Sequence, residues 1–79
     1  MAEQSPFIPS KRIEQLKVNI HLARLRGQPS TYQHIGAHFD LSVSYVGELI
    51  NGSYQSAHAL MWFERFENYV DKLLKEEMT

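Results

Sequence analysis

Two histidines, His34 and His38, stand four residues apart and have the spacing of a pair of metal ligands. On a helix this spacing puts both imidazole rings on one face. The chain contains no cysteine, and no suitably placed acid completes a ligand set around the two rings. We therefore expect two solvated polar side chains here, with no metal and no cofactor.

Catalysis finds no support in the residue types. No nucleophile is paired with a base, no glycine-rich loop could cradle a phosphate, and no pair of acids suggests a pocket. Met61, Trp62 and Phe63 could line a ligand pocket, but an aromatic stripe at helical spacing more often belongs to a core or an interface. We expect a protein that is not an enzyme and that takes no small-molecule ligand.

The stretch from residue 32 to residue 52, YQHIGAHFDLSVSYVGELING, is the most informative part of the chain. On two short helices joined by a tight turn, its small and apolar residues all point to the seam between the helices. These residues are Ile35, Gly36, Phe39, Leu41, Val46 and Leu49. Gly36 is expected where the helices approach most closely, so a larger side chain there would hold them apart. The spacing predicts a helix-turn-helix, whose second helix enters the major groove of DNA.

Capping residues mark the ends of both short helices. Ser30 or Thr31 can cap one helix, which runs to about residue 39, and Ser42 can cap the next, from residue 43 to about residue 51. Asp40 stands in the turn between them, where a left-handed backbone is needed. Gly52 is expected to end the second of the two helices.

The segment VGELING, residues 46–52, resembles the helix-turn-helix repressors of temperate phages, the lambda repressor and Cro-like class. The resemblance extends over residues 31–60. It implies a compact helical bundle that binds palindromic operators in double-stranded DNA as a dimer. It also implies base contacts from the start of the helix at residues 43–48, where Ser44 can donate to or accept from a base, Val43 can contact a thymine methyl group, and Glu48 can accept from the N4 amino group of cytosine. Phosphate contacts are implied from the preceding helix start and from residues 51–54. The implied DNA-binding residues are Tyr32, Gln33, Ser42, Val43, Ser44, Tyr45, Gly47, Glu48, Asn51, Ser53 and Tyr54.

Two features depart from the pattern of this class. Asp40 occupies a position where glycine is usual, although aspartate tolerates a left-handed backbone better than most residues. The reading helix contains no lysine or arginine, so it cannot make the common arginine–guanine contact. We therefore expect modest affinity that depends strongly on dimerisation.

Flanking segments complete the expected domain. Residues 1–9 are expected to be a flexible lead-in, and Ser10 to cap a first helix that runs to about Arg26. That helix carries two apolar stripes on nearly opposite sides. Ser56 can cap a long last helix over about residues 57–76. Residues 10–79 are thus predicted to form a compact, all-α, four-helix domain.

The last helix has an apolar surface that covers almost half of its circumference, more than the stripe of about 100° that one core requires. The residues on this surface are Trp62, Phe63, Phe66, Tyr69, Val70, Leu73 and Leu74. We expect them to serve as both core and homodimer interface. The alternative is a monomer in which the first helix covers the whole surface.

Composition and charge limit the partners. The net charge is −1, with five cations against three acids in residues 1–40 and three against six in residues 41–79. The basic half could therefore face DNA. The longest apolar run, residues 57–63, is broken by His58 and is far shorter than the roughly 20 residues of a membrane span. The lack of cysteine suits a reducing cytoplasm, where we expect the protein on the bacterial nucleoid when it is bound to DNA.

Two hypotheses follow for the function. The first is a sequence-specific DNA-binding transcriptional regulator, a repressor of phage, plasmid or mobile-element type that binds a palindromic operator as a homodimer. The second is a helix-turn-helix fold used as a protein–protein interaction module, an adaptor or an inhibitor. The neutral reading helix and the acidic second half favour the second hypothesis.

Overall fold

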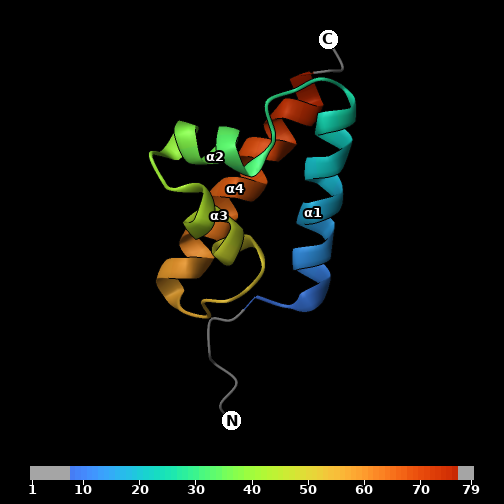
Figure 1. Ribbon diagram of the computed structural model, residues 1–79. Coiled ribbons are helices and arrows are strands. Elements are labelled where there is room, and N and C mark those ends of the chain that lie inside the picture. Colours follow the sequence, from blue (N-terminus) through green and yellow to red (C-terminus); the bar gives the residue numbers. More distant parts are fainter. Residues whose placement is uncertain (1–7, 77–79) are drawn as a thin grey trace.

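The computed structural model describes residues 8–76, which form four helices and no strand. The helices are α1 (Ser10–Leu25), α2 (Tyr32–Phe39), α3 (Val43–Ile50) and α4 (Ala57–Glu76) (Figure 1). The predicted all-α, four-helix class is confirmed. The bounds of all four helices lie within one residue of those expected from the caps and stop signals.

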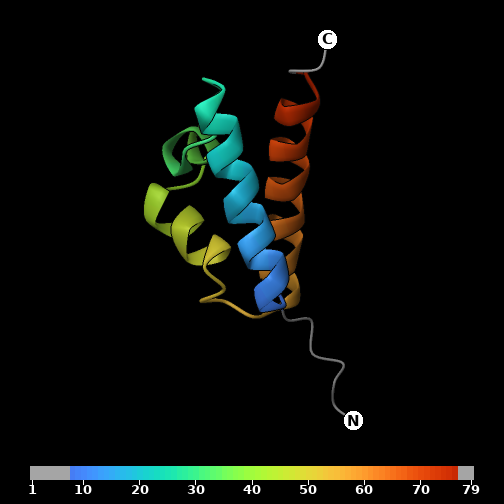
Figure 2. The same cartoon turned by 90° about the vertical axis from the view of Figure 1, so that its right-hand side faces the viewer.

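The two long helices, α1 and α4, pack along each other, and the two short helices lie on the other side of α1 in the view of Figure 2. A bidentate ion pair joins the long helices at their surface. Arg12 donates from Nε to Glu67 Oε2 at 2.9 Å and from Nη2 to Glu67 Oε1 at 2.7 Å. Glu64 adds a weaker contact at 3.6 Å. These contacts fix the acidic side of α4 against α1.

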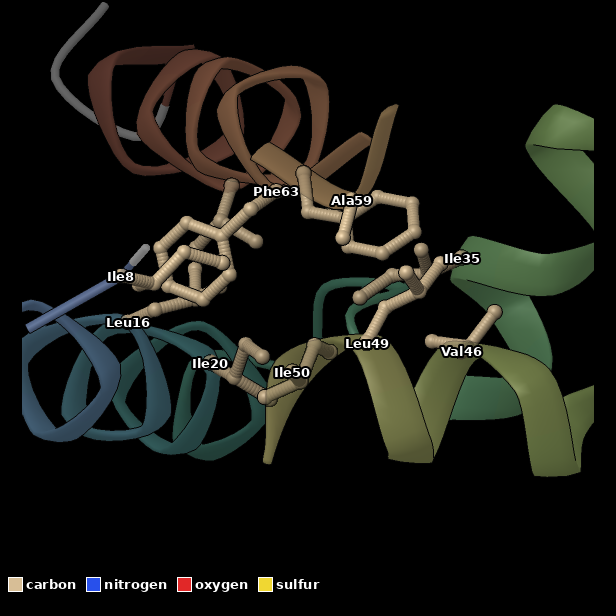
Figure 3. Close-up of a cluster of buried hydrophobic side chains, with 11 residues drawn as sticks. Ile8, Leu16, Ile20, Ile35, Val46, Leu49, Ile50, Ala59 and Phe63 are labelled. Carbon is tan, nitrogen blue, oxygen red and sulfur yellow. The ribbon is translucent and has the colours of Figure 1, made fainter. Parts of the chain in front are cut away.

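The core lies where all four helices meet, and side chains from each of them point into it (Figure 3). It contains Ile8, Leu16, Ile20, Ile35, Val46, Leu49, Ile50, Ala59, Phe63, Phe66 and Val70. Ser30 is the one buried polar residue among residues 8–76, and its hydroxyl donates to the carbonyl oxygen of Ile20 at 2.8 Å. A buried hydroxyl with such a partner avoids the cost of an unmade hydrogen bond. The loop between α1 and α2 is thereby fastened to α1.

The chain before α1 differs from the expected lead-in. Ile8 is only 3% exposed in the core, and its N–H donates to Gln55 Oε1 at 2.7 Å. Pro9, with an extended backbone, is the N-cap of α1, and Ser10 is the first helical residue with no side-chain cap. The predicted flexible segment is therefore wrong at residues 8 and 9, because burial of an isoleucine and a long-range hydrogen bond hold them. Its remaining part, residues 1–7, lies outside the described residues.

The expected interface on α4 also needs correction. Phe63, Phe66 and Val70 are completely buried in the core of a single chain, so they are not available to a second subunit in this fold. The breadth of the apolar surface has a simpler reason, since α1 and α3 contact α4 directly and α2 packs the ring of Phe39 against it. The other four expected interface residues, Trp62, Tyr69, Leu73 and Leu74, are half-buried.

Candidate nucleic-acid interface

Side-chain caps and one left-handed residue set the geometry of α2, the turn and α3. Thr31 Oγ1 accepts from the N–H of His34 at 3.2 Å, and Ser42 Oγ accepts from the N–H of Tyr45 at 3.1 Å. Each cap satisfies one of the N–H groups that a helix start leaves without a partner. Asp40 has φ 63° and ψ 45°, the left-handed conformation expected of it. The cap at Ser42 and the left-handed turn at Asp40 are as predicted, and of the two candidate caps for α2, Ser30 and Thr31, it is Thr31 that caps the helix.

Gly36 is buried at the point where the turn crosses α2. A Cβ atom on Gly36 would lie 2.5 Å from the carbonyl oxygen of Leu41 and 3.5 Å from Cγ2 of Val46. The N–H of Leu41 donates back to the carbonyl oxygen of Gly36 at 2.7 Å. Gly36 therefore lies closest to the backbone of the turn. Its approach to α3, which the sequence had predicted to be the closest one, is less tight.

The exposed side of α3 has a fixed orientation, because the opposite side of the helix is buried in the core. Val46, Leu49 and Ile50 are completely buried, so the helix cannot rotate without exposing its apolar residues. The predicted base-reading residues Val43, Ser44 and Glu48, with Asn51 just past the helix end, are exposed; we name these four residues the α3 face. Val43 is 49% exposed, a high value for an aliphatic side chain.

Two tyrosines cover one end of the α3 face. The rings of Tyr45 and Tyr54 lie 5.7 Å apart, and the hydroxyl of Tyr54 donates to Glu48 Oε1 at 2.8 Å. This hydrogen bond and the negative charge of Glu48 raise the pKa of Tyr54 above its ordinary value. Tyr45 is half-buried, so only part of its side chain is accessible. One oxygen of Glu48 is thus already engaged within the chain.

The remaining predicted DNA contacts lie near the start of α2 and after α3. Gln33 and Ser53 are exposed, whereas Tyr32 is half-buried, and burial raises the pKa of its phenol. Gly47 is half-buried because the ring of Tyr32 covers it, 3.4 Å from where a Cβ atom would stand. Tyr32 therefore joins the start of α2 to the middle of α3.

Three basic residues that the motif did not include lie beside the start of α2. Lys17, His21 and Arg24 of α1 line a pocket of about 270 Å³ together with Ile20, Thr31 and Tyr32; we name it the basic pocket. The sequence contained a signal for this row, because spacings of four and three residues put side chains on one face of a helix. The spacing could not predict that these three residues lie beside α2, because their position there depends on how α1 packs.

A second, larger hollow of about 460 Å³ lies between the end of α2 and α4. Its lining includes the apolar side chains of Phe39, Tyr69 and Leu73 and the cationic side chains of Arg65 and Lys72. The ring of Tyr69 is fixed, because its hydroxyl donates to the carbonyl oxygen of Pro29 at 2.9 Å. Two half-buried residues of the expected dimer interface, Tyr69 and Leu73, are accessible here.

The two histidines of α2 have separate surroundings. His34 Nδ1 lies 2.7 Å from Thr31 Oγ1, while the ring of His38 packs against Phe39 and Tyr69. Over residues 8–76, no three histidine, aspartate or glutamate side chains gather in a way that could hold a metal ion. None of the helices described here has the length and apolar character needed to cross a membrane.

No protein-family model matches the chain, and no match was found among curated proteins or solved structures.

Proposed function

We propose that this protein is a sequence-specific DNA-binding transcriptional regulator, a repressor of phage, plasmid or mobile-element type. The observation that carries the proposal is the α3 face. A short helix, fixed by three buried residues and by capping at its start, leaves one polar side exposed to solvent. Eight helical residues span about 12 Å, a length that suits the major groove, which is about 12 Å wide.

Base reading in this proposal depends on small contacts. Ser44 exchanges hydrogen bonds with a base edge, Val43 contacts a thymine methyl group, and the second carboxylate oxygen of Glu48 accepts from cytosine. The first N–H groups of α2 and α3 approach phosphates, which they can do without formal charge. Gln33 and Ser53 add phosphate contacts from both ends of the motif. Occupancy of the operator then blocks RNA polymerase sterically.

The proposal includes a homodimer, because eight residues in one groove read too few base pairs for a unique site. Two copies of α3 would enter successive major grooves about 34 Å apart on a palindromic operator. Because the other expected interface residues are buried in the core, the part of α4 that is available for a subunit contact consists of Trp62, Tyr69, Leu73 and Leu74. A Leu73→Glu variant that sediments as a monomer and binds only one half-site would support this arrangement.

The test is a fluorescence anisotropy titration of the purified protein against DNA from upstream of its own gene and against scrambled DNA. We expect a preference of at least about a hundredfold for the upstream fragment, a threshold set below the roughly thousandfold or more that is typical of specific regulators because the α3 face makes only small contacts. Ser44→Ala should weaken binding to the preferred fragment only. Equal binding to both fragments, or none at low salt, would refute specific recognition.

A charge reversal with a matched control tests which surface meets DNA. Glu48→Lys on the α3 face should strengthen binding to scrambled DNA, because it adds attraction to phosphate. Asp71→Lys makes the same change on α4, where the replaced aspartate forms an ion pair with Lys75 at the surface. It should have a much smaller effect. Equal effects of the two variants would mean that only net charge matters and that the α3 face is not the contact.

A second candidate function is a protein-binding module. The cluster of Tyr45, Tyr54 and Glu48 favours it, since aromatic residues are enriched at protein contacts and the α3 face has no cation. In this case Tyr45→Ala would abolish capture of a protein partner. The substitutions Ser44→Ala and Glu48→Lys would then leave DNA binding unchanged at its low level.

A further inference from the structure

We propose that the basic pocket is an oxyanion site that takes one phosphate group, supplied by the DNA backbone when the protein is bound to its operator. The source of the phosphate rests on the proposed function, whereas the site itself does not. The pocket is lined by Lys17, His21 and Arg24 on one side and by the start of α2 on the other. Its volume of about 270 Å³ is near the lower limit of small-molecule pockets, so it suits a single small group.

Convergence of unpaired cations is the first reason for this proposal. Arg12 is engaged by Glu67 and Glu64, and Lys75 pairs with Asp71. Within residues 8–76, by contrast, no ion pair joins Lys17 or Arg24 to an acid, and no acid is among the residues that line the pocket. Positive charge without an internal partner attracts an anion from outside the chain.

The opposite wall of the pocket adds donors that need no charge. Thr31 is the N-cap of α2, and its hydroxyl oxygen already accepts from the N–H of His34. The N–H groups of Tyr32 and Gln33, at the first two helical positions, have no carbonyl partner in the preceding turn. A helix start of this kind favours an anion through its N–H groups and its dipole. The start of α2 therefore adds a second kind of oxyanion donor beside the cations that line the pocket.

The location of the pocket points to backbone phosphate as the group that fills it. Tyr32 lines the pocket and also covers Gly47 of α3, so the pocket borders the side of the domain that carries the α3 face. A helix in the major groove has the two phosphate backbones on its flanks, and contacts to them fix its register. Phosphate in the basic pocket would orient α3 and would supply the attraction that α3 itself lacks.

The first test measures how DNA affinity depends on salt. A double variant, Lys17→Gln with Arg24→Gln, is compared with Lys11→Gln with Arg26→Gln, which removes the same charge at two exposed positions outside the pocket. Loss of one phosphate contact should reduce the slope of log Kobs against log salt by about 0.9 for the first variant. The slope of the second variant should stay close to that of the original protein. Equal slopes for the two variants would overturn the DNA assignment of the site.

The second test does not depend on DNA. Amide chemical shifts of Thr31, Tyr32 and Gln33 are followed by NMR while inorganic phosphate is added, with sodium chloride of equal ionic strength as the reference. Phosphate should shift these signals in the original protein and in the Lys11/Arg26 variant, and should not shift them in the Lys17/Arg24 variant. Shifts of equal size in all three proteins, or none, would mean that the pocket is no oxyanion site.

The two tests together separate the site from the proposed function. Phosphate-dependent shifts in a protein that binds no DNA would leave the oxyanion site standing and would assign it to a free phosphate or phosphate ester. Specific DNA binding with an unchanged slope in the Lys17/Arg24 variant would leave the regulator standing and would remove this site from its DNA contacts. Circular dichroism of each variant controls for loss of the fold.

Discussion

A comparison of two glycines tests whether the helix-turn-helix is packed as tightly as the structure indicates. Gly36 and Gly47 both lie inside helices, and neither has a positive φ. A Cβ atom on Gly36 would lie 2.5 Å from the backbone oxygen of Leu41, so the turn would have to move. A Cβ atom on Gly47 would lie 3.4 Å from the ring of Tyr32, which is an ordinary contact.

The expected magnitude follows from two terms. Each glycine-to-alanine change stabilises a helix interior by about 0.5–1 kcal/mol. Gly36→Ala also overpacks the turn, which costs roughly 1–3 kcal/mol, whereas Gly47→Ala does not. Since the helix term is common to both, Gly47→Ala should exceed Gly36→Ala in free energy of unfolding by about 1–3 kcal/mol. In a domain of this size, 1 kcal/mol corresponds to roughly 4–8 °C in Tm.

Urea denaturation followed by circular dichroism at 222 nm measures this difference directly. The original protein and both alanine variants are compared at one pH and one protein concentration, because any dimerisation would make stability depend on concentration. We expect the denaturation midpoints to rank Gly47→Ala above the original protein and Gly36→Ala below it. If the two variants agree within about 0.5 kcal/mol, the contact between Gly36 and the turn is not tight and the reasoning fails.

Three further experiments test the packing of α4. In a double-mutant cycle on the free energy of unfolding, Arg12→Met and Glu67→Gln should show a coupling energy of at most about 1 kcal/mol, because the ion pair is partly exposed. The coupling energy should be smaller in 1 M NaCl. No coupling at low salt would mean that the ion pair does not contribute to stability. Burial raises the pKa of Tyr69, so the folded chain keeps a proton that the unfolded chain loses, and stability should fall as the pH rises above about 10. Tyr69→Phe should make that fall smaller in urea titrations from pH 8 to pH 11, and an unchanged fall would contradict this. Phe63→Ala should lower the free energy of unfolding of the monomer by about 3–5 kcal/mol, because Phe63 is buried in the core. If the variant instead loses dimerisation while its monomer stays stable, Phe63 lies in a subunit interface.

The short helices and their turn were predictable because their determinants are local. Thr31 and Ser42 each accept from an N–H three residues ahead, and Asp40 adopts its left-handed conformation within the turn itself. Such interactions depend on a few neighbouring residues, so the residue types and their order are sufficient to indicate them. The exposure of Val43 and Ser44 follows from the same pattern, since the apolar residues of α3 occupy the opposite side.

Errors arose where a residue's surroundings come from distant parts of the chain. Ile8 was expected in a flexible segment, but it is held by Gln55, which follows 47 residues later. Phe63 and Phe66 were expected at a subunit contact, and the packing of other helices on α4 buries them instead. The hydrogen bond between Tyr54 and Glu48 spans a loop whose path no local rule specifies. Helical periodicity shows that a surface is apolar, but it does not show what covers the surface.

The sequence by itself determined that this protein has four helices with their ends near the observed residues, and that two of them form a capped helix-turn-helix with a tight glycine. Short-range hydrogen bonds, backbone preferences and periodicity are sufficient for this. Only the tertiary structure decided which apolar side of α4 is enclosed, and that Lys17 and Arg24 of α1 meet the start of α2 in one pocket. Those outcomes depend on how helices pack against one another, where burial summed over many distant residues selects one arrangement.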